Sequence, residues 1–513
     1  MSTYIPRNDG TRWADPQEIK SSNSIKQIDV SKECNACGLP IISDGQTAYV
    51  DSSDTHTLVF GSTGSKKTRL FGMPLLNMIA LAGESFIATD PKGELYEKTS
   101  GLATANGYNV ITLNFRDLDK SSMWNPLKLP YDLHHGGKKD EGIALINDFL
   151  NTLAEPQRKE TKDPYWIEMG FSMALAYMLF FMETATEKQA NISNFITFFT
   201  ANTSPESAEA LSNCTAEGSI ASINFKHILT NKQADRTYAC VSSTATSLFT
   251  PFTTRRALCQ LLSKSDFDIR RVGREKTAIY IIVPDEKTAL HFLISVFVKQ
   301  IYEALIGEAQ IEKNKMLPIR VNFILDEFCN IPTIPDMPSM ISAARSRNMR
   351  FFLMAQGMYQ MQRKYGEDAE TIKGNCDNWV FLTSREYGLL QEISRLCGET
   401  MYNDLSGNKM SRPLISVSEL QRLKKEKGEA LILHGRHYPF MAELPDIDDY
   451  EFKKYPPTPA IRKRLPEILH YNANPVVDKI KNGKSPLLFS REVSSRRAYF
   501  EDIMDDLDLF LTE

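Results

Sequence analysis

The sequence lacks the features that mark a disulfide-stapled protein or a wholly basic nucleic-acid-binding protein. Lys and Arg number 60 against 64 Asp and Glu, a net charge of −4, so no basic excess over the whole chain indicates nucleic-acid binding. Any nucleic-acid site must therefore be a local patch or a channel. Eight cysteines among 513 residues are too few for a disulfide framework and fit a chain whose thiols stay reduced in the cytoplasm.

Long apolar runs and a signal peptide are also missing. The longest apolar run, Met173–Met182, is about half of the ~20 residues that span a bilayer, and it predicts a buried helix segment. Residues 1–15 do not have the basic and then apolar layout of a signal peptide. We therefore expect a cytoplasmic protein without a transmembrane anchor.

What the sequence does contain is an alternation of short apolar runs and helical patterns, which begins near residue 51. Such alternation is typical of a parallel sheet covered by helices. With 42% hydrophobic residues, the chain has enough apolar sequence to give each of two or three domains a core. The expected strands are Thr57–Phe60, Ser85–Thr89, Asn109–Asn114, Thr277–Val283, Val321–Leu325, Arg350–Met354, Asn378–Leu382 and Ala430–Leu433.

Residues 135–260 interrupt this alternation with helical patterns and no convincing strand, which predicts an inserted all-α domain. The fold class expected is therefore α/β, a large mostly parallel sheet flanked by helices, with that insertion. The expected parts are an N-terminal segment 1–50, a nucleotide-binding domain in two pieces (51–134 and 261–445), the insertion 135–260, and a tail 446–513.

The two ends of the chain are less regular. Cys34 and Cys37 have the spacing of half a zinc site or a redox pair, but no second Cys/His pair follows nearby, so two ordinary thiols are the alternative. Basic residues predominate in 461–497, whereas 498–513 carries acidic and apolar residues and no base. The acidic end is either a docking segment or a solvated tail.

A glycine-rich loop follows the first expected strand. The sequence from Gly61 to Thr68, before a helical pattern, has the strand, loop and helix layout of a phosphate-binding loop. Backbone N–H groups of such a loop surround phosphates, a Lys reaches the β and γ phosphates, and a hydroxyl ligates Mg²⁺. The nucleotide-binding residues expected are Gly61, Ser62, Thr63, Gly64, Ser65, Lys66, Lys67 and Thr68.

Lys66 departs from the pattern, which has glycine before the phosphate-binding lysine. Because the spacing from Gly61 to Lys67 and Thr68 is intact, we assign the catalytic lysine role to Lys67 and the metal role to Thr68. Glycine tolerates tight backbone geometry beside phosphates, so the Lys66 side chain must point away or add charge to the site. The departure puts the hydrolysis rate in question.

Polar residues at the ends of two later strands complete a candidate site. Asp326 ends an apolar strand and can hold Mg²⁺, and the next residue, Glu327, can orient the attacking water. Gln356 ends another strand and can sense the γ phosphate. Arg345 stands at the end of an expected helix, where it either acts on a neighbouring subunit's nucleotide or is a solvated base.

Taken in order, these segments resemble the TraG/TraD-like coupling proteins of type IV secretion, which are P-loop ATPases of conjugation. The resemblance covers about residues 50–445. Its most distinctive segment is Asp90-Pro91-Lys92-Gly93-Glu94, which by itself predicts only an Asp helix cap with Pro in the first helical position. The other segments that carry it are Gly61–Thr68, Trp124–Leu127, Leu325–Phe328, Ala343–Arg347 and Ala355–Gln356.

The resemblance implies a RecA/FtsK-like P-loop NTPase that uses ATP and Mg²⁺. It assigns Walker A roles to Lys67 and Thr68, Walker B roles to Asp326 and Glu327, an arginine finger to Arg345 and a γ-phosphate sensor to Gln356. It also implies a hexamer with a DNA-conducting channel, a relaxase as partner, and attachment to secretion-channel proteins or a separate membrane anchor at the inner membrane.

Three functions are compatible with these residues. The leading hypothesis is an ATP-driven coupling protein that recruits a relaxase–DNA complex and delivers it to a type IV secretion channel. One alternative is a nucleotide-binding docking platform with little hydrolysis, blunted by Lys66. Another is an FtsK/HerA-like translocase in DNA partition, although 446–513 does not resemble a winged helix.

Tyr165 and Trp166 in the insertion fit either a base-stacking platform or, more simply, helical core packing.

Overall fold

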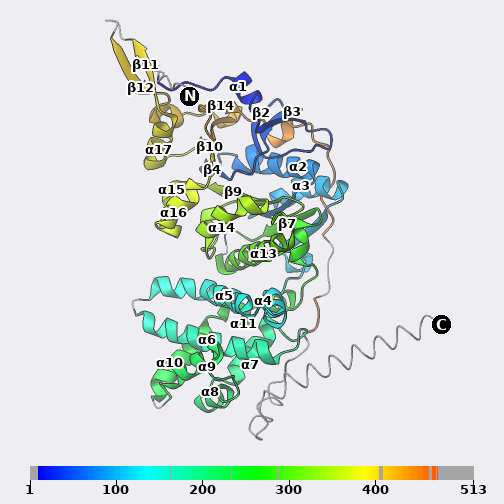
Figure 1. The fold of residues 1–513 in the computed structure, drawn as a ribbon, viewed down its shortest axis with the longest axis vertical. Helices are drawn as coiled ribbons and strands as arrows, with labels where there is room; N and C mark the ends of the chain where they lie inside the picture. The colour runs from blue at the N-terminus through cyan, green and yellow to red at the C-terminus, as the bar shows by residue number, and fades with distance from the viewer. Residues whose placement is uncertain are drawn as a thin grey trace, which may run out of the picture. The chain divides into compact units, whose positions relative to one another are not determined.

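The computed structural model describes residues 10–161, 163–232, 234–284, 286, 288–403, 408–460, 465–468 and 471. The chain forms two compact units, each described here by itself (Figure 1). Unit 1 comprises 1–122 and 266–464, and unit 2 comprises 123–265 and 465–513.

Unit 1 is built on a nine-stranded sheet in the order β14-β13-β10-β4-β9-β8-β5-β7-β6, counted over the described residues. The seven strands from β10 to β6 are mutually parallel, and β13 and β14 extend the sheet antiparallel beyond β10. The strands are β4 (Thr57–Gly61), β5 (Ser85–Thr89), β6 (Asn109–Asn114), β7 (Thr277–Ile282), β8 (Val321–Leu325), β9 (Met349–Ala355), β10 (Asn378–Thr383), β13 (Glu429–His434) and β14 (Phe440–Glu443).

The predicted α/β class with a large, mostly parallel sheet is confirmed. Each of the eight predicted strands is present, and β14 is an additional edge strand that the sequence analysis missed. The central strands are buried along their whole length, as in β4, β5, β8 and β9. Burial on both faces explains why their sequences are continuous apolar runs rather than alternating ones.

Helices cover both faces of the sheet. Phe351 stacks on Phe323 and lies beside Tyr302 of α13 (Phe292–Ile311), whereas the next residue, Phe352, lies beside Phe71 before α2 (Met73–Ala82). Successive strand residues point to opposite faces, so α13 and α2 cover opposite sides. The other unit 1 helices are α1 (Pro16–Lys20), α3 (Glu94–Ala105), α14 (Met337–Ala344), α15 (Met358–Tyr365), α16 (Asp368–Gly374), α17 (Tyr387–Cys397) and α18 (Val417–Leu420).

The N-terminal part of unit 1 is more ordered than the polar segment that the sequence suggested. It holds a three-stranded antiparallel sheet in the order β1-β3-β2, and its apolar residues join the core formed by α2 and α3. The strands are β1 (Ile25–Asp29), β2 (Leu39–Ser43) and β3 (Thr47–Asp51), and a separate hairpin is formed by β11 (Glu399–Asn403) and β12 (Lys409–Pro413).

The described part of unit 2 is helical, with no strand, so the predicted all-α insertion is present between β6 and β7. Its core is aromatic: Tyr177 lies among Phe198, Phe199 and Phe225. The helices are α4 (Lys128–His135), α5 (Lys139–Glu160), α6 (Pro164–Thr184), α7 (Ile192–Ala201), α8 (Pro205–Ser212), α9 (Ile220–Leu229), α10 (Asp235–Ser247), α11 (Thr250–Thr253) and α12 (Arg256–Leu261).

Two helical segments of the described chain are long and apolar enough to cross a membrane by length and composition alone. They are Pro164–Thr184 and Thr288–Ile311, and 72% and 83% of their most apolar windows are buried inside the structure. Such burial is what the core helices of globular domains show. The first segment contains Met173–Met182, which the sequence predicted to be a buried helix segment.

Candidate functional site

The glycine-rich loop lies between β4 and a helix whose first turns have π geometry. The π segment, η1 (Thr68–Gly72), runs directly into α2. Single π turns inside α-helices are frequent at functional sites. A Cβ on Gly61 would come within 2.4 Å of the Ser65 hydroxyl and 2.7 Å of Lys67 Cγ, so any other residue here would displace these two side chains.

Lys67 is held inside this loop. Its side chain is 5% exposed. Its Nζ donates to the carbonyl of Gly61 over 2.6 Å and lies 3.7 Å from Oε1 of Glu327. The Ser65 hydroxyl is buried and has no hydrogen-bond partner among the described residues. An orphaned donor and a buried ammonium in one loop fit an anionic ligand such as a phosphate.

The side chain of Lys66 points away from the loop interior, toward the segment after β14. Its Nζ lies 3.5 Å from Oδ2 of Asp446, which also accepts a hydrogen bond from Nε of Arg69 over 3.0 Å. The backbone of Lys66 has a φ of +64°, in the left-handed region. The glycine of the usual pattern adopts this conformation without steric cost, whereas a side chain there costs about 1–2 kcal/mol.

We expect Lys66→Gly to be more stable than Lys66→Ala by about 1 kcal/mol, because only glycine relieves the strain at this backbone position. Both variants lose the half-exposed pair with Asp446, which contributes ~0–1 kcal/mol. The measurement is the free energy of unfolding in denaturant. Equal stabilities of the two variants would contradict the left-handed conformation of Lys66.

Thr68 and Asp326 meet across the base of the loop. The Thr68 hydroxyl donates to Oδ2 of Asp326 over 3.1 Å, although 258 residues separate them in sequence. Burial and the neighbouring Glu327 carboxylate raise the pKa of Asp326 to about 6, against the opposing effect of Lys67. A hydroxyl at the start of the helix after β4 and a carboxylate at the carboxyl end of β8 form the oxygen pair that a P-loop offers to Mg²⁺.

Glu327 lies beside Lys67 and is held by two side-chain amides. Its Oε2 accepts hydrogen bonds from Nε2 of Gln356 over 2.8 Å and from Nδ2 of Asn330 over 3.0 Å. Gln356 follows β9, which lies between β4 and β8 in the sheet. The structure therefore brings together five predicted site residues, Lys67, Thr68, Asp326, Glu327 and Gln356.

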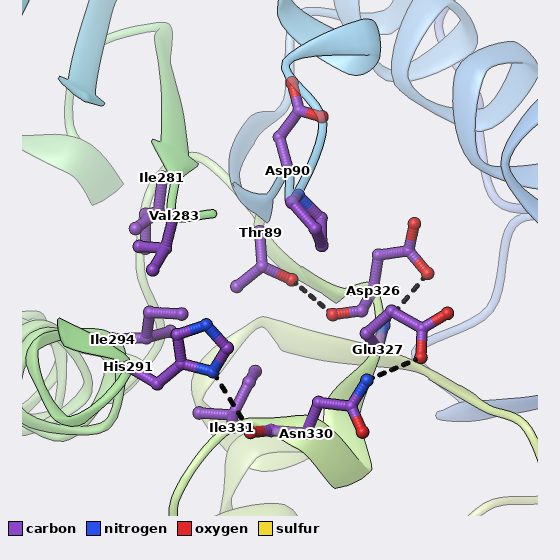
Figure 2. Close-up of a pocket in the computed structure, with 11 residues that line it drawn as sticks. Thr89, Asp90, Ile281, Val283, His291, Ile294, Asp326, Glu327, Asn330 and Ile331 are labelled. Atoms are coloured by element: carbon purple, nitrogen blue, oxygen red, sulfur yellow. Dashed lines mark hydrogen bonds between the residues drawn. The ribbon is translucent and has the colours of Figure 1, made fainter. Parts of the chain in front are cut away.

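A small pocket opens behind Asp326, where the ends of β5, β7 and β8 meet (Figure 2). Thr89 donates to the Asp326 carbonyl over 2.8 Å, and burial raises the pKa of Asp90 to about 6. Asp90 accepts from the N–H of Tyr96, in the first turn of α3, over 2.8 Å, but that helix begins at Glu94 and its N-cap residue is Gly93. The expectation of an Asp90 helix cap with Pro91 as the first helical residue is therefore wrong.

Arg345 lies on the opposite edge of the sheet from the glycine-rich loop. It bonds Asp377 over 2.8 Å and Asp54 over 3.4 Å, and these two acids precede β10 and β4, whereas the loop follows β4. The length of the parallel strands separates Arg345 from Lys67 of its own chain. Arg345 can therefore contact a bound nucleotide only if that nucleotide belongs to a neighbouring subunit. That role stays a prediction.

Three further predictions concern the cysteine pair, the aromatic pair of the insertion and the acidic end of the chain. Cys37 is buried with its Sγ 3.4 Å from Nη2 of Arg350, and the described residues hold no group of three or more potential metal ligands. Tyr165 is 43% exposed and meets Trp166 edge-on, so the expectation of helical core packing is wrong for Tyr165. The segment 498–513 lies outside the described residues.

Two residues of the site were missed by the sequence analysis. Asn330 stands three residues after Glu327, and the spacing of a single turn could have indicated it. Asp446 could not have been found in this way, because its partner Arg69 is 377 residues distant and no local pattern joins them.

Comparison with known proteins gives one family and one fold. The family described as "Type IV secretory system Conjugative DNA transfer" matches residues 12–433. No curated protein matches the chain. Among solved structures, the bacterial conjugative coupling protein TrwBdeltaN70 with sulphate has a TM-score of 0.59 at 14% identity, covering 89% of this chain and 98% of its own.

Two further structures have the same fold. The plasmid coupling protein TrwB in complex with the non-hydrolysable ATP analogue ADPNP has a TM-score of 0.63 at 16% identity, covering 89% of this chain and 97% of its own. TrwB in complex with ADP and Mg²⁺ has a TM-score of 0.60 at 15% identity, covering 88% and 95%. The predicted P-loop fold with an inserted helical domain is thereby confirmed.

Proposed function

The chain belongs to the type IV secretory system conjugative DNA transfer family, and on this premise we propose that it is an ATP-driven coupling protein. In this role it recruits a relaxase–DNA complex and delivers it to the secretion channel. The observation that carries the proposal is the cluster of Lys67, Thr68, Asp326, Glu327 and Gln356 around one glycine-rich loop.

ATP phosphates are the ligand that fits this loop. Lys67 supplies a buried ammonium, the Ser65 hydroxyl lacks a partner among the described residues, and the start of η1 adds backbone N–H groups. Bound phosphate takes the place of the Gly61 carbonyl and Glu327 as the partner of Lys67. Thr68 and Asp326 hold Mg²⁺, which neutralises phosphate charge when bound. TrwB crystallised with ADPNP and with ADP plus Mg²⁺ supports this assignment.

Glu327 is the group that removes a proton from the attacking water, because its Oε1 faces Lys67 and so the site of the γ phosphate. Gln356 senses the γ phosphate from the end of β9. Arg345 of a neighbouring subunit stabilises the developing charge, which requires a ring, and we propose a homo-hexamer. The placement of Arg345 away from its own loop supports action between subunits.

The partners follow from family membership. Conjugative DNA transfer requires DNA and the membrane-associated secretion machinery, and we place the protein at the cytoplasmic face of the inner membrane, attached through a channel protein or a separate anchor. We assign the all-α insertion, residues 135–260, to recognition of the relaxase or other cargo, and the two pieces 51–134 and 261–445 to the nucleotide-binding motor.

We expect ATP turnover to rise when single- or double-stranded DNA is added, and this stimulation to fall steeply with salt, because phosphate contacts release counterions. Phosphate release is measured with each DNA form over a range of salt concentrations. Absence of DNA binding at any salt concentration and in any nucleotide state would contradict a DNA-coupled motor.

The same experiment separates the alternative functions. A docking platform has one structural observation in its favour, the strained Lys66 in the phosphate loop. It predicts nucleotide binding without turnover, and recovery of turnover in Lys66→Gly. Because the Lys66 side chain is directed toward Asp446 rather than into the loop, we expect Lys66→Gly to leave turnover close to that of the unaltered protein.

A further inference from the structure

We propose that Asn330 is a positioning residue for Glu327, which selects the carboxylate oxygen that faces the phosphate loop. The inference rests on the proposed function, since it concerns the orientation of the group that activates water. It starts from a turn just after β8 that binds Glu327 twice, and Figure 2 shows the bond between the two side chains.

The turn is η5 (Phe328–Asn330), and it folds the Asn330 side chain back over Glu327. The Asn330 backbone N–H donates to the Glu327 carbonyl over 2.7 Å, and its side-chain Nδ2 donates to Oε2 over 3.0 Å. Phe328 anchors the turn, because it is fully buried and stacks on Tyr365 with the ring centroids 5.3 Å apart.

The backbone of Glu327 requires such anchoring. Its φ is +52°, in the left-handed region that residues other than glycine rarely adopt. A residue persists in this conformation only where its surroundings over-determine it, and such positions cluster at functional sites. Asn330 bonds both the backbone carbonyl and the side chain of Glu327, and the Glu327 N–H donates to Oδ1 of Asp326 over 2.9 Å.

The pattern of donors decides which oxygen can act. A carboxylate oxygen has two lone pairs, and both lone pairs of Oε2 are engaged, one by Asn330 and one by Gln356. Oε1 is left facing Lys67 at 3.7 Å. The oxygen that can accept a proton from water is therefore the one on the side where Lys67 meets the phosphates.

Asn330 and Gln356 are not equivalent in this arrangement. Gln356 is expected to turn to the γ phosphate when nucleotide binds, and the bond from Asn330 to Oε2 then holds the carboxylate so that Oε1 still faces Lys67. Asn330 has no such second role, and its backbone carbonyl lies 3.3 Å from Nδ1 of His291. Nε2 of His291 lies closer to the Pro284 carbonyl, at 2.8 Å, and a neutral imidazole donates from one nitrogen only. The turn is therefore anchored by the buried Phe328 ring, which keeps Asn330 in place and Glu327 aligned.

The test compares Asn330→Ala and Asn330→Asp with the unaltered protein in steady-state ATP turnover. A misplaced proton acceptor lowers kcat by about tenfold to a hundredfold while the phosphate loop still binds ATP, so KM changes little. Asn330→Asp keeps the shape but loses the donor and adds a repelling charge, so it is expected to be at least as slow. Unchanged kcat in both variants would overturn the proposal, as would a rise in KM alone.

Asn375→Ala is the matched control, because Asn375 is partly exposed at the end of α16 and, among the described residues, its side chain donates to the Thr371 carbonyl of that helix. It is expected to keep the turnover of the unaltered protein. The absolute turnover of the unaltered protein tests the proposed function, and the ratio of variant to unaltered protein tests this inference.

A second measurement keeps the inference testable if the unaltered protein hydrolyses no ATP, in which case the proposed function has failed. Thermal unfolding midpoints of nucleotide-free Asn330→Ala, Glu327→Ala and the double variant form a double-mutant cycle. Non-additive shifts support the pairing of the two side chains. Additive shifts overturn it.

Discussion

Glu327→Gln is expected to lower ATP turnover by about 10²–10⁴-fold, the contribution of a positioned general base, and to leave ATP affinity within a few-fold of the unaltered protein. Gln keeps the shape of Glu and an oxygen that can accept the bonds from Asn330 and Gln356, so the site stays assembled. What it loses is the ability to take a proton from water. Phosphate release gives turnover, and a fluorescent non-hydrolysable analogue gives affinity.

Two comparisons make this result specific. Glu217→Gln changes a glutamate whose side chain is 95% exposed in the helical unit, and it is expected to leave turnover unchanged. Lys67→Ala removes the buried ammonium and is expected to weaken binding and turnover together. If Glu327→Gln retained most of its turnover, another group would have to be the base and the assignment of Glu327 would be wrong.

The sequence predicts those parts of the site that continuous segments encode. The loop from Gly61 to Thr68 and the strand ending at Asp326 are short patterns whose spacing alone indicates phosphate and metal chemistry. The structure adds that they meet, through the hydrogen bond between Thr68 and Asp326. The strands were predictable for the same reason, because each buried strand is an uninterrupted apolar run.

What the sequence does not predict depends on contacts between distant segments. Strand β1 escaped prediction because it is partly exposed, and its buried apolar residues are Ile25 and Ile28 alone. The Lys66 side chain points away from the loop because it pairs with Asp446, a residue that follows the last strand of the large sheet. The left-handed backbone of Glu327 has no signal in the residue type.

Arg350 is the clearest case of such a contact. As the second residue of β9 it is 1% exposed, although an arginine is almost never fully buried unless it is paired. Its guanidinium pairs with Glu84 over 2.7 Å and donates to Asn322 over 2.9 Å. It also donates to the carbonyls of Cys37 and Ser53 over 3.1 and 3.0 Å, and so links the N-terminal sheet to the large one.

Arg350→Met is therefore expected to destabilise the protein by about 3–5 kcal/mol, because it leaves a largely buried carboxylate and two carbonyls without their donor. Arg320 lies 3.6 Å from Glu84 and offsets part of this loss, which favours the lower end of the range. The measurement is the free energy of unfolding in denaturant at pH 7. A loss below about 1 kcal/mol would place this residue among ordinary surface arginines and contradict its burial.

The pH dependence of the stability lost in Arg350→Met distinguishes loss of the ion pair from loss of side-chain packing. Burial alone raises the pKa of Glu84, but Arg350 and Arg320 hold it below its ordinary value. A carboxyl with a lowered pKa stabilises the fold above its unfolded pKa and loses that contribution as pH falls. In Arg350→Met the buried Glu84 carboxyl is favoured in its protonated form instead. Lowering the pH therefore reduces the destabilisation that the unpaired carboxylate causes. The stability gap between the two proteins is expected to narrow from pH 7 toward pH 4 if the ion pair is its cause. The double variant Glu84→Gln, Arg350→Met has no carboxyl at this position, so the stability gap between it and the single variant Glu84→Gln is expected not to change with pH.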